Sequence, residues 1–204
     1  MGQLLTSLSG IFFSKPEMDF KLVMIGLDSA GKTTILYKMK LDQPANALVS
    51  TAPTIGYNLE EFEVKNVKIK VWDLSGQERM RHAWKYYFET VNGVIFVIDS
   101  ADRARINDVR DELHQILGEL MGGNNCGVVP LLILANKQDV QGALGYSELR
   151  DSLALCGDYE KRGRIRIQEA SALQDKGLTE GFEWIVEEIG KVSKEGRQAA
   201  VKKL

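Results

Sequence analysis

One segment of the chain combines two glycines, a lysine and a threonine at the spacing of a phosphate-binding loop. Residues 26–33 read Gly-Leu-Asp-Ser-Ala-Gly-Lys-Thr, which fits the pattern G-x-x-x-x-G-K-[ST]. The glycines let the backbone curl so that successive N–H groups point inward, and a helix beginning near Lys32 adds its positive dipole end. In such a cradle Lys32 reaches the β- and γ-phosphates and the Thr33 hydroxyl binds Mg²⁺. The alternative, a glycine-rich turn with an exposed lysine, is disfavoured because the pattern is rare by chance.

Two further segments supply carboxylates after apolar runs. Asp73 follows Val71-Trp72 and suits an acid that holds Mg²⁺, although an aspartate at a strand end more often serves as a turn residue or cap. Asp139 ends the segment 136–139, Asn-Lys-Gln-Asp, and its carboxylate can accept two parallel hydrogen bonds from guanine. Adenine lacks that edge, and an unpaired carboxylate facing it would cost about 1–3 kcal/mol. The segment therefore favours guanine and disfavours an ATP-dependent kinase or ATPase; an ordinary polar loop is the alternative.

The elements that would position these residues follow from hydrophobic patterning. Short apolar runs predict strands over 20–25, 59–64, 67–72, 93–98 and 131–134, and helical periodicity predicts helices from about 32, over 106–120 and over 182–192. The runs 59–64 and 67–72 flank Lys65-Asn66 and predict an antiparallel hairpin. Strands that alternate with helices predict an α/β fold, with a mostly parallel sheet covered by helices on both faces.

Composition excludes several classes of protein. A chain of 204 residues with a net charge of −2 predicts one domain with short appendages and lacks the basic excess of nucleic-acid binders. The longest apolar run is far shorter than the roughly 20 residues of a transmembrane helix. Cys126 and Cys156 are too far apart for a close zinc-ligand pair and form no disulfide framework, so we expect reduced thiols in a cytoplasmic protein.

Five motifs occur in the order used by small GTPases. They are GLDSAGKTT, APTIGYN, WDLSGQER, NKQD and EASAL. Their sequences resemble those of the Arf and Arf-like family, and the resemblance extends from about residue 2 to residue 190. The resemblance implies a P-loop NTPase G domain that binds GTP or GDP with Mg²⁺, built on a six-stranded sheet with an antiparallel interswitch hairpin. We expect the G domain at 18–192, an amphipathic helix at 1–17 and a polar, fraying tail at 193–204.

The resemblance also implies the roles of individual residues. Thr33, Thr54 and, through water, Asp73 would hold Mg²⁺; the Gly76 N–H would sense the γ-phosphate, and Gln77 would orient the hydrolytic water as the catalytic residue. Segments 52–58 and 75–82 would be the two switches. The remaining implied nucleotide contacts are Asp28, Ser29, Ala30, Gly31, Lys32, Thr34, Asn136, Lys137, Asp139, Ser171, Ala172 and Leu173. Tyr57, Trp72 and Tyr87 match an aromatic effector surface, with ordinary packing as the alternative.

The first switch contains no arginine placed to stabilise the charge that develops on the phosphates during hydrolysis, so we expect the intrinsic hydrolysis of GTP to be slow. A GTPase-activating protein would supply an arginine in trans, and a guanine nucleotide exchange factor would release GDP. We expect a monomer that recruits effector proteins in vesicle and protein traffic, on the cytosolic face of Golgi or other endomembranes. A non-hydrolysing GTP-binding membrane scaffold is the alternative, because Ser75 stands where most Arf proteins have glycine and the approach to the first switch, 42–52, is long.

The N-terminal residues predict a membrane contact. Gly2 fits the N-myristoylation pattern M-G-x-x-x-[ST]. The apolar residues of this segment fall on one helical stripe, and these are Leu4, Leu5, Leu8, Ile11 and Phe12. One myristoyl chain binds a bilayer only weakly, with an association constant on the order of 10⁴ M⁻¹, so the helix would be the second signal. A helix packed permanently on its own domain is the alternative. In the family, the helix is docked with GDP and displaced with GTP as the hairpin shifts register.

Overall fold

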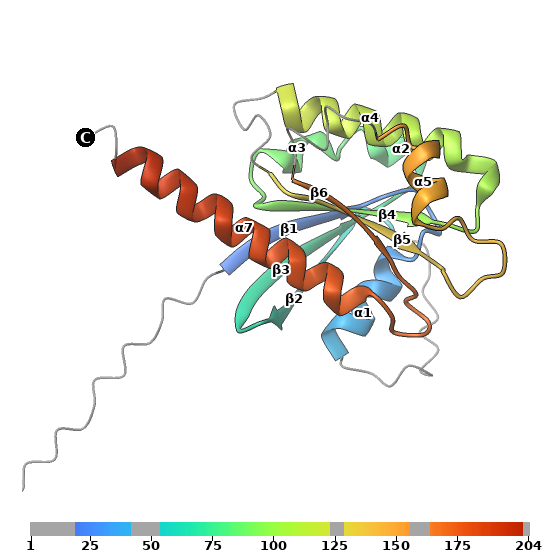
Figure 1. Ribbon diagram of the computed structural model, residues 1–204, viewed down its shortest axis with the longest axis horizontal. Coiled ribbons are helices and arrows are strands. Elements are labelled where there is room, and N and C mark those ends of the chain that lie inside the picture. Colours follow the sequence, from blue (N-terminus) through green and yellow to red (C-terminus); the bar gives the residue numbers. More distant parts are fainter. Residues whose placement is uncertain (1–18, 42–53, 123–128, 156–163, 202–204) are drawn as a thin grey trace, which may run out of the picture.

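The computed structural model describes residues 19–41, 54–122, 129–155 and 164–201 (Figure 1). The expected helix at 1–17, the acylation candidate Gly2 and the approach to the first switch at 42–52 lie outside these residues. The described elements follow in chain order: β1 (Asp19–Ile25), α1 (Lys32–Leu41), β2 (Tyr57–Val64), β3 (Val67–Leu74), α2 (Glu78–Arg81), α3 (Lys85–Phe88), β4 (Gly93–Asp99), the 3₁₀ helix η1 (Arg103–Arg105), α4 (Ile106–Gly122), β5 (Leu131–Asn136), α5 (Tyr146–Ser152), β6 (Ile165–Glu169) and α7 (Leu178–Val201).

Six strands form one sheet in the order β2-β3-β1-β4-β5-β6. All neighbouring strands pair in parallel except β2 and β3, which form an antiparallel hairpin. The hairpin turns at Lys65 and Asn66, whose φ angles of 50° and 59° are the left-handed values that a type I′ turn requires. The predicted α/β fold, parallel sheet and hairpin are therefore confirmed.

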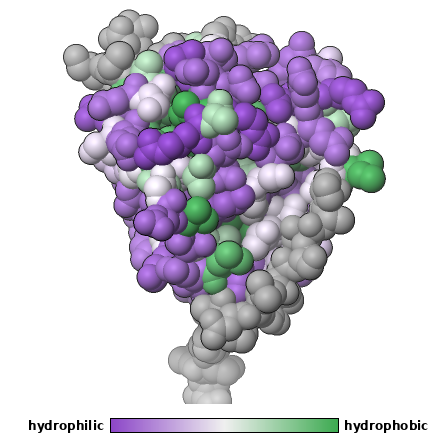
Figure 2. Space-filling model, turned by 90° about the vertical axis from the view of Figure 1, so that its right-hand side faces the viewer, coloured by the Kyte–Doolittle hydropathy of each residue, from purple (hydrophilic) through white to green (hydrophobic). Residues whose placement is uncertain are grey.

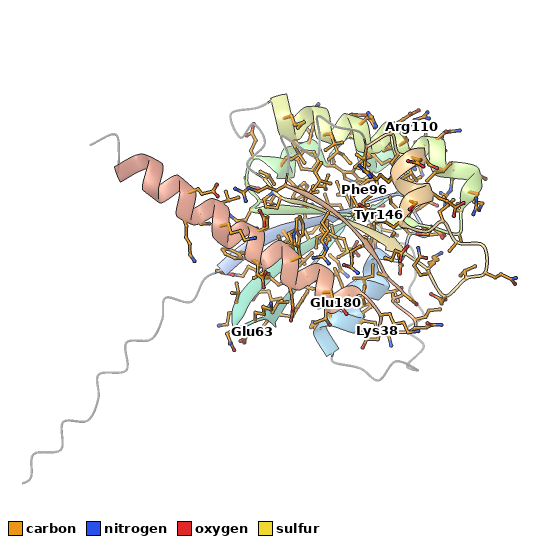
Figure 3. All side chains as sticks on the ribbon, in the orientation of Figure 1. Lys38, Glu63, Phe96, Arg110, Tyr146 and Glu180 are labelled. Carbon is orange, nitrogen blue, oxygen red and sulfur yellow. The ribbon has the colours of Figure 1, made fainter. Side chains whose placement is uncertain are left out.

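Helices cover both faces of the sheet and divide the core in two. On one face α3, α4 and α5 pack over a cluster that includes Phe96 and Leu113, and on the other α1 and α7 pack over a cluster that includes Leu36 and Phe182 (Figure 1). Phe96 lies among the side chains between the sheet and α4, whereas Arg110 points outward from that helix (Figure 3). Strands β4 and β5 are buried along nearly their whole length, as central strands must be.

The C-terminal residues differ in secondary structure from the sequence prediction. Helix α7 continues through Val201, so residues 193–201 are helical and do not form the frayed tail that the polar sequence indicated. One contact from outside the helix reaches this stretch: Arg164, which also pairs with Glu188 in the preceding turns, pairs with Glu195 at 2.6 Å. This ion pair links the extended end of α7 to the segment before β6.

The exterior is largely polar. On the face shown in Figure 2, hydrophilic side chains predominate and the hydrophobic residues lie in small separate groups. Within the described part of the chain, no helix has both the length and the apolar character needed to cross a bilayer.

Candidate functional site

A cleft of about 410 Å³ opens where β1, β3 and β5 end. Ligand sites of open α/β sheets form at the carboxyl ends of the strands, so this is the expected position. The cleft is lined by loops that follow the three strands, by the start of α1 and by Thr54, which precedes β2. The lining residues are Asp28, Ser29, Gly31, Lys32, Thr33, Thr34, Thr54, Ser75, Gly76, Gln77 and Lys137. Ten of these eleven were predicted as nucleotide, metal or catalytic residues, and Ser75 was singled out as a departure from the family pattern.

The loop from Gly26 to Thr33, here called the P-loop, has a backbone conformation that requires glycine at two positions. Gly26 and Gly31 have φ angles of 139° and 95°, which side chains rarely allow. A Cβ at Gly26 would also overlap the carbonyl of Val97, and one at Gly31 would overlap the Asn136 amide. The loop therefore curls tightly into the start of α1 and directs that helix N-terminus at the cleft.

Lys32 is buried at the centre of the P-loop. Its Nζ donates to the carbonyl oxygens of Gly26 and Leu27, each 2.9 Å away. Burial lowers the pKa of Lys32 from 10.5 to about 8, and the negative charges of Asp73 and Asp28 only partly offset this. A phosphate group in the cleft would supply the missing negative partner, so the lysine is suited to an anionic ligand.

Three oxygen-bearing side chains from separate segments meet beside Lys32. The Thr33 hydroxyl donates to Asp73 Oδ2 at 2.5 Å and lies 2.9 Å from the Thr54 hydroxyl, which is 3.4 Å from the same carboxylate oxygen. Burial raises the pKa of Asp73, opposed by its hydrogen bond from Thr33 and the charge of Lys32. Asp73 Oδ1 is buried and, among the described residues, has no hydrogen-bond partner. This arrangement fits Mg²⁺, which takes oxygen ligands and bound water.

The second switch begins directly against the P-loop. A Cβ at Gly76 would overlap the backbone of Gly26 and Leu27, so only glycine allows this approach. Gln77 follows as the N-cap of α2, is half-buried and lines the cleft. Ser75 has no left-handed φ; its N–H donates to the Gly56 carbonyl and its own carbonyl accepts from the Trp84 indole. The serine is thus accommodated without backbone strain.

The predicted base-recognition residues also converge. Asn136 Nδ2 donates to the Ala30 carbonyl at 2.8 Å and its Oδ1 accepts from the Ala172 N–H at 3.0 Å, joining the P-loop to the loop after β6. Asp139 accepts a hydrogen bond from Ser171. Lys137 lines the cleft, and its Nζ pairs with Asp99 at 2.6 Å.

The last predicted base contact and the aromatic residues differ in exposure. Leu173 is about half exposed, unlike the buried Ser171 and Ala172 that precede it. Tyr57 is 61% exposed on β2, whereas Trp72 and Tyr87 are half-buried and pack against the α4-side core. Trp72 and Tyr87 thus contribute to packing and Tyr57 lies at the surface, while the effector role of these residues stays a prediction.

Sequence reasoning missed two arginines at the edge of the cleft. Arg105 of η1 donates to Asp28 Oδ1 at 3.0 Å, and Arg81 of α2 lies 3.7 Å from the same oxygen. Arg81 also donates to the Gly76 carbonyl at 2.9 Å and pairs with Glu112 of α4. No spacing motif marks either arginine, because each reaches the P-loop only through the packing of its own element.

Known proteins share both the sequence pattern and the fold. The chain matches the model of the ADP-ribosylation factor family over residues 5–189. It is similar to the solved structure of the Arl6 (BBS3) small GTPase from Trypanosoma brucei with the bound nucleotide analogue GppNp. The two are 34% identical, the match covers 85% of this chain and 99% of that one, and the TM-score is 0.74. The G-x-x-x-x-G-K-[ST] loop, the Asn-Lys-Gln-Asp segment and these similarities agree, and the chain belongs to the Arf family of small GTPases.

Proposed function

We propose that this chain binds Mg²⁺-GTP and hydrolyses it slowly to GDP, as a switch that recruits effector proteins to membranes in intracellular traffic. The observation that carries the proposal is the meeting of Thr33, Thr54 and Asp73 beside the buried Lys32. Thr54 belongs to the first switch and the other two residues to fixed elements. A metal bound by all three would therefore tie the conformation of the switch to the nucleotide.

Gln77 and Gly76 are the residues we assign to the hydrolytic step. The backbone of Gly76 lies directly against the P-loop, and Gln77 lines the cleft directly after it. When bound, Mg²⁺ would neutralise charge on the β- and γ-phosphates, while Gln77 would orient the attacking water. Neither Arg81 nor Arg105 is free to act on the phosphates in this arrangement, because both pair with carboxylates. An activating protein that supplies an arginine in trans would complete the site.

Effector docking and membrane attachment are the outputs we propose for the switch. Several large apolar side chains of the first switch, β2 and α3 are exposed, namely Ile55, Tyr57, Leu59 and Tyr86. Exposed apolar side chains in and next to a switch suit a protein partner that binds one nucleotide state. We propose that Gly2 is myristoylated and that the segment 1–17 supplies the second membrane signal.

The first experiment identifies the nucleotide that the protein carries. Protein purified from cells with Mg²⁺ present is denatured, and the released nucleotide is separated chromatographically against standards. Predominantly GDP supports a guanine-selective hydrolysis cycle. Retained GTP would favour the scaffold alternative, and ATP or ADP in place of guanine nucleotide would contradict the proposed function.

Single-turnover hydrolysis separates the switch from the scaffold. Protein loaded with GTP is followed for phosphate release with and without a candidate activating protein, and compared with Gln77→Leu. We expect slow release that the activating protein accelerates and that the variant loses, with GTP affinity retained. No phosphate release under any condition would favour the non-hydrolysing scaffold. Ser75 does not itself argue for that alternative, because its backbone is not strained.

Membrane attachment is tested by sedimentation with liposomes. Acylated protein and a Gly2→Ala variant are each loaded with GDP or with GppNp, mixed with liposomes and centrifuged. We expect the unchanged protein to pellet with GppNp and the variant to stay in solution. Equal pelleting of the variant would contradict the role of Gly2.

A further inference from the structure

The P-loop carries a carboxylate at the end of the cleft nearest the second switch. Asp28 lines the cleft, and a Cβ placed on Gly76 would lie 2.5 Å from the Asp28 backbone nitrogen. The two residues therefore meet backbone to backbone. A negative side chain at this position opposes a polyphosphate, because like charges a few ångströms apart repel strongly in a partly buried site.

Arg105 holds this carboxylate from outside the cleft. Its Nη1 donates to Asp28 Oδ1 at 3.0 Å and its Nη2 donates to the Asp28 carbonyl at 3.3 Å, so the planar guanidinium grips both side chain and backbone. Arg105 is itself oriented by Asp102, which accepts from its Nε at 2.6 Å and caps η1 by accepting from its N–H. The contact is therefore prearranged by the fold.

A second cation, Arg81, approaches the same oxygen. Arg81 Nη2 lies 3.7 Å from Asp28 Oδ1, and the same side chain bonds the Gly76 carbonyl and Glu112. Arg81 belongs to the second switch, which is expected to rearrange with the nucleotide. Arg105 belongs to η1, between β4 and α4 and outside both switch segments. Of the two arginines, Arg105 is thus the one that can hold Asp28 in every nucleotide state.

We propose that Arg105 is a positioning residue that keeps the Asp28 carboxylate on the η1 side of the P-loop and neutralises it, so that the cleft accepts the third phosphate of GTP. The proposal rests on the proposed function, because it names what selects between the two nucleotides of that cycle. GDP lacks the γ-phosphate and its charge. Loss of Arg105 should consequently weaken GTP binding more than GDP binding.

The test is the ratio of two affinities in matched variants. Dissociation constants for GDP and GppNp are measured with Mg²⁺ by competition against a fluorescent GDP. For Arg105→Ala we expect the affinity for GppNp relative to GDP to fall about tenfold, a difference of about 1.4 kcal/mol. Arg105→Lys, which retains the charge, should restore part of the ratio. Arg103→Ala is the matched control: Arg103 lies in the same 3₁₀ helix but bonds Gly142 and Glu148, so its ratio should not change.

The Asp28→Asn background separates a charge effect from a structural one. Once the carboxylate is an amide, adding Arg105→Ala should leave the ratio unchanged. Equal weakening of both nucleotides by Arg105→Ala, or the same drop in the Asp28→Asn background, would overturn the proposal. If Arg105→Ala does not fold, Arg105→Gln keeps most of the side chain without its charge, and an unchanged ratio in that variant overturns the proposal. Failure of the unchanged protein to bind either nucleotide would instead overturn the proposed function.

Discussion

The Asn136 side-chain amide donates a hydrogen bond to the carbonyl oxygen of Ala30, 2.8 Å away, and this bond joins two loops that are more than a hundred residues apart in the chain. Through its Oδ1, Asn136 also accepts from the Ala172 N–H at 3.0 Å. One buried side chain therefore sets the distance between the P-loop and the loop that we propose contacts the base.

Replacing Asn136 by alanine should affect both stability and binding. The change leaves a buried carbonyl and a buried N–H unsatisfied, so we expect the free energy of unfolding to fall by about 2–3 kcal/mol. GDP and GTP affinities should fall together, because the variant loosens the phosphate and base ends of the site at once. Chemical denaturation and nucleotide dissociation rates measure the two effects. Gln174→Ala, at an exposed side chain of the same loop, is the control, and a similar loss in it would contradict the role of Asn136.

Asp139→Asn should change which base is bound. The side-chain oxygen of an asparagine here can still accept the hydrogen bond from guanine N1–H. Its NH₂ group, however, would face the exocyclic amine of guanine, and two donors cannot bond each other. We expect GTP affinity to fall roughly 100-fold and affinity for xanthosine triphosphate, which has an oxygen there, to rise. Competition binding with the two triphosphates measures the change. If the variant still prefers GTP, Asp139 does not contact the base. Its role would then be the hydrogen bond that it accepts from Ser171 in the unchanged protein.

The depressed pKa of Lys32 predicts a pH dependence of stability. In the nucleotide-free protein the folded-state pKa of about 8 lies below the unfolded value of 10.5. Below pH 8 both states carry the proton, and the full cost of burying the charge, about 3 kcal/mol, is present. Between pH 8 and 10.5 the unfolded state binds more protons, so the free energy of unfolding should rise with pH. Denaturation of the empty protein across this range tests the prediction.

Lys32→Met isolates this effect from other titrating groups. The variant buries no charge, so it should be more stable than the unchanged protein near pH 7.5 and should lose the rise above pH 8. Its nucleotide affinity should collapse, because no ammonium remains to face the phosphates. Parallel pH profiles for the two proteins would show that Lys32 is not responsible.

Gly76→Ala should uncouple the second switch from the P-loop. A Cβ there overlaps the backbone of Gly26 and Leu27, which cannot move aside as a side chain could. We expect a loss of about 1–3 kcal/mol in stability and markedly slower single-turnover hydrolysis, with GDP still bound. Gly190→Ala is the control, since nothing lies near its added Cβ and a helical alanine should stabilise by up to about 1 kcal/mol. Undiminished hydrolysis in Gly76→Ala would contradict the close approach.

The sequence predicted the strands and the nucleotide-facing residues well because both depend on local pattern. The uninterrupted apolar run of β4 and the alternation of β2 and β3 each reflect a physical environment along one segment. Strand β6 was not placed, because its residues are half-buried at the sheet edge and Ile-Arg-Ile-Gln-Glu carries too little apolar signal. The end of α7 was missed because its support comes from Arg164, far away in the chain.

The site was predictable where backbone geometry dictates residue type. The P-loop glycines and the motif carboxylates could be found because a tight curl and a phosphate cradle demand those residues at fixed spacing. Arg81, Arg105 and the pairing of Lys137 with Asp99 could not, because they depend on how long side chains reach between packed elements. Such contacts are set by tertiary structure and leave no periodic trace.

The P-loop and the residues next to it contribute side chains to both apolar clusters of the core. Ile25 and Leu27, at the start of the loop, belong to the α4-side cluster, whereas Ala30 within the loop and Leu36 in α1 belong to the cluster under α1 and α7. Local unfolding of either switch therefore leaves both anchors of the loop in place. Hydrogen exchange should accordingly find the flanking amides of β1 and α1 among the slowest in the molecule, even while the switch amides exchange freely. In the proposed switch, the nucleotide cradle would therefore keep its shape while the switch segments change conformation.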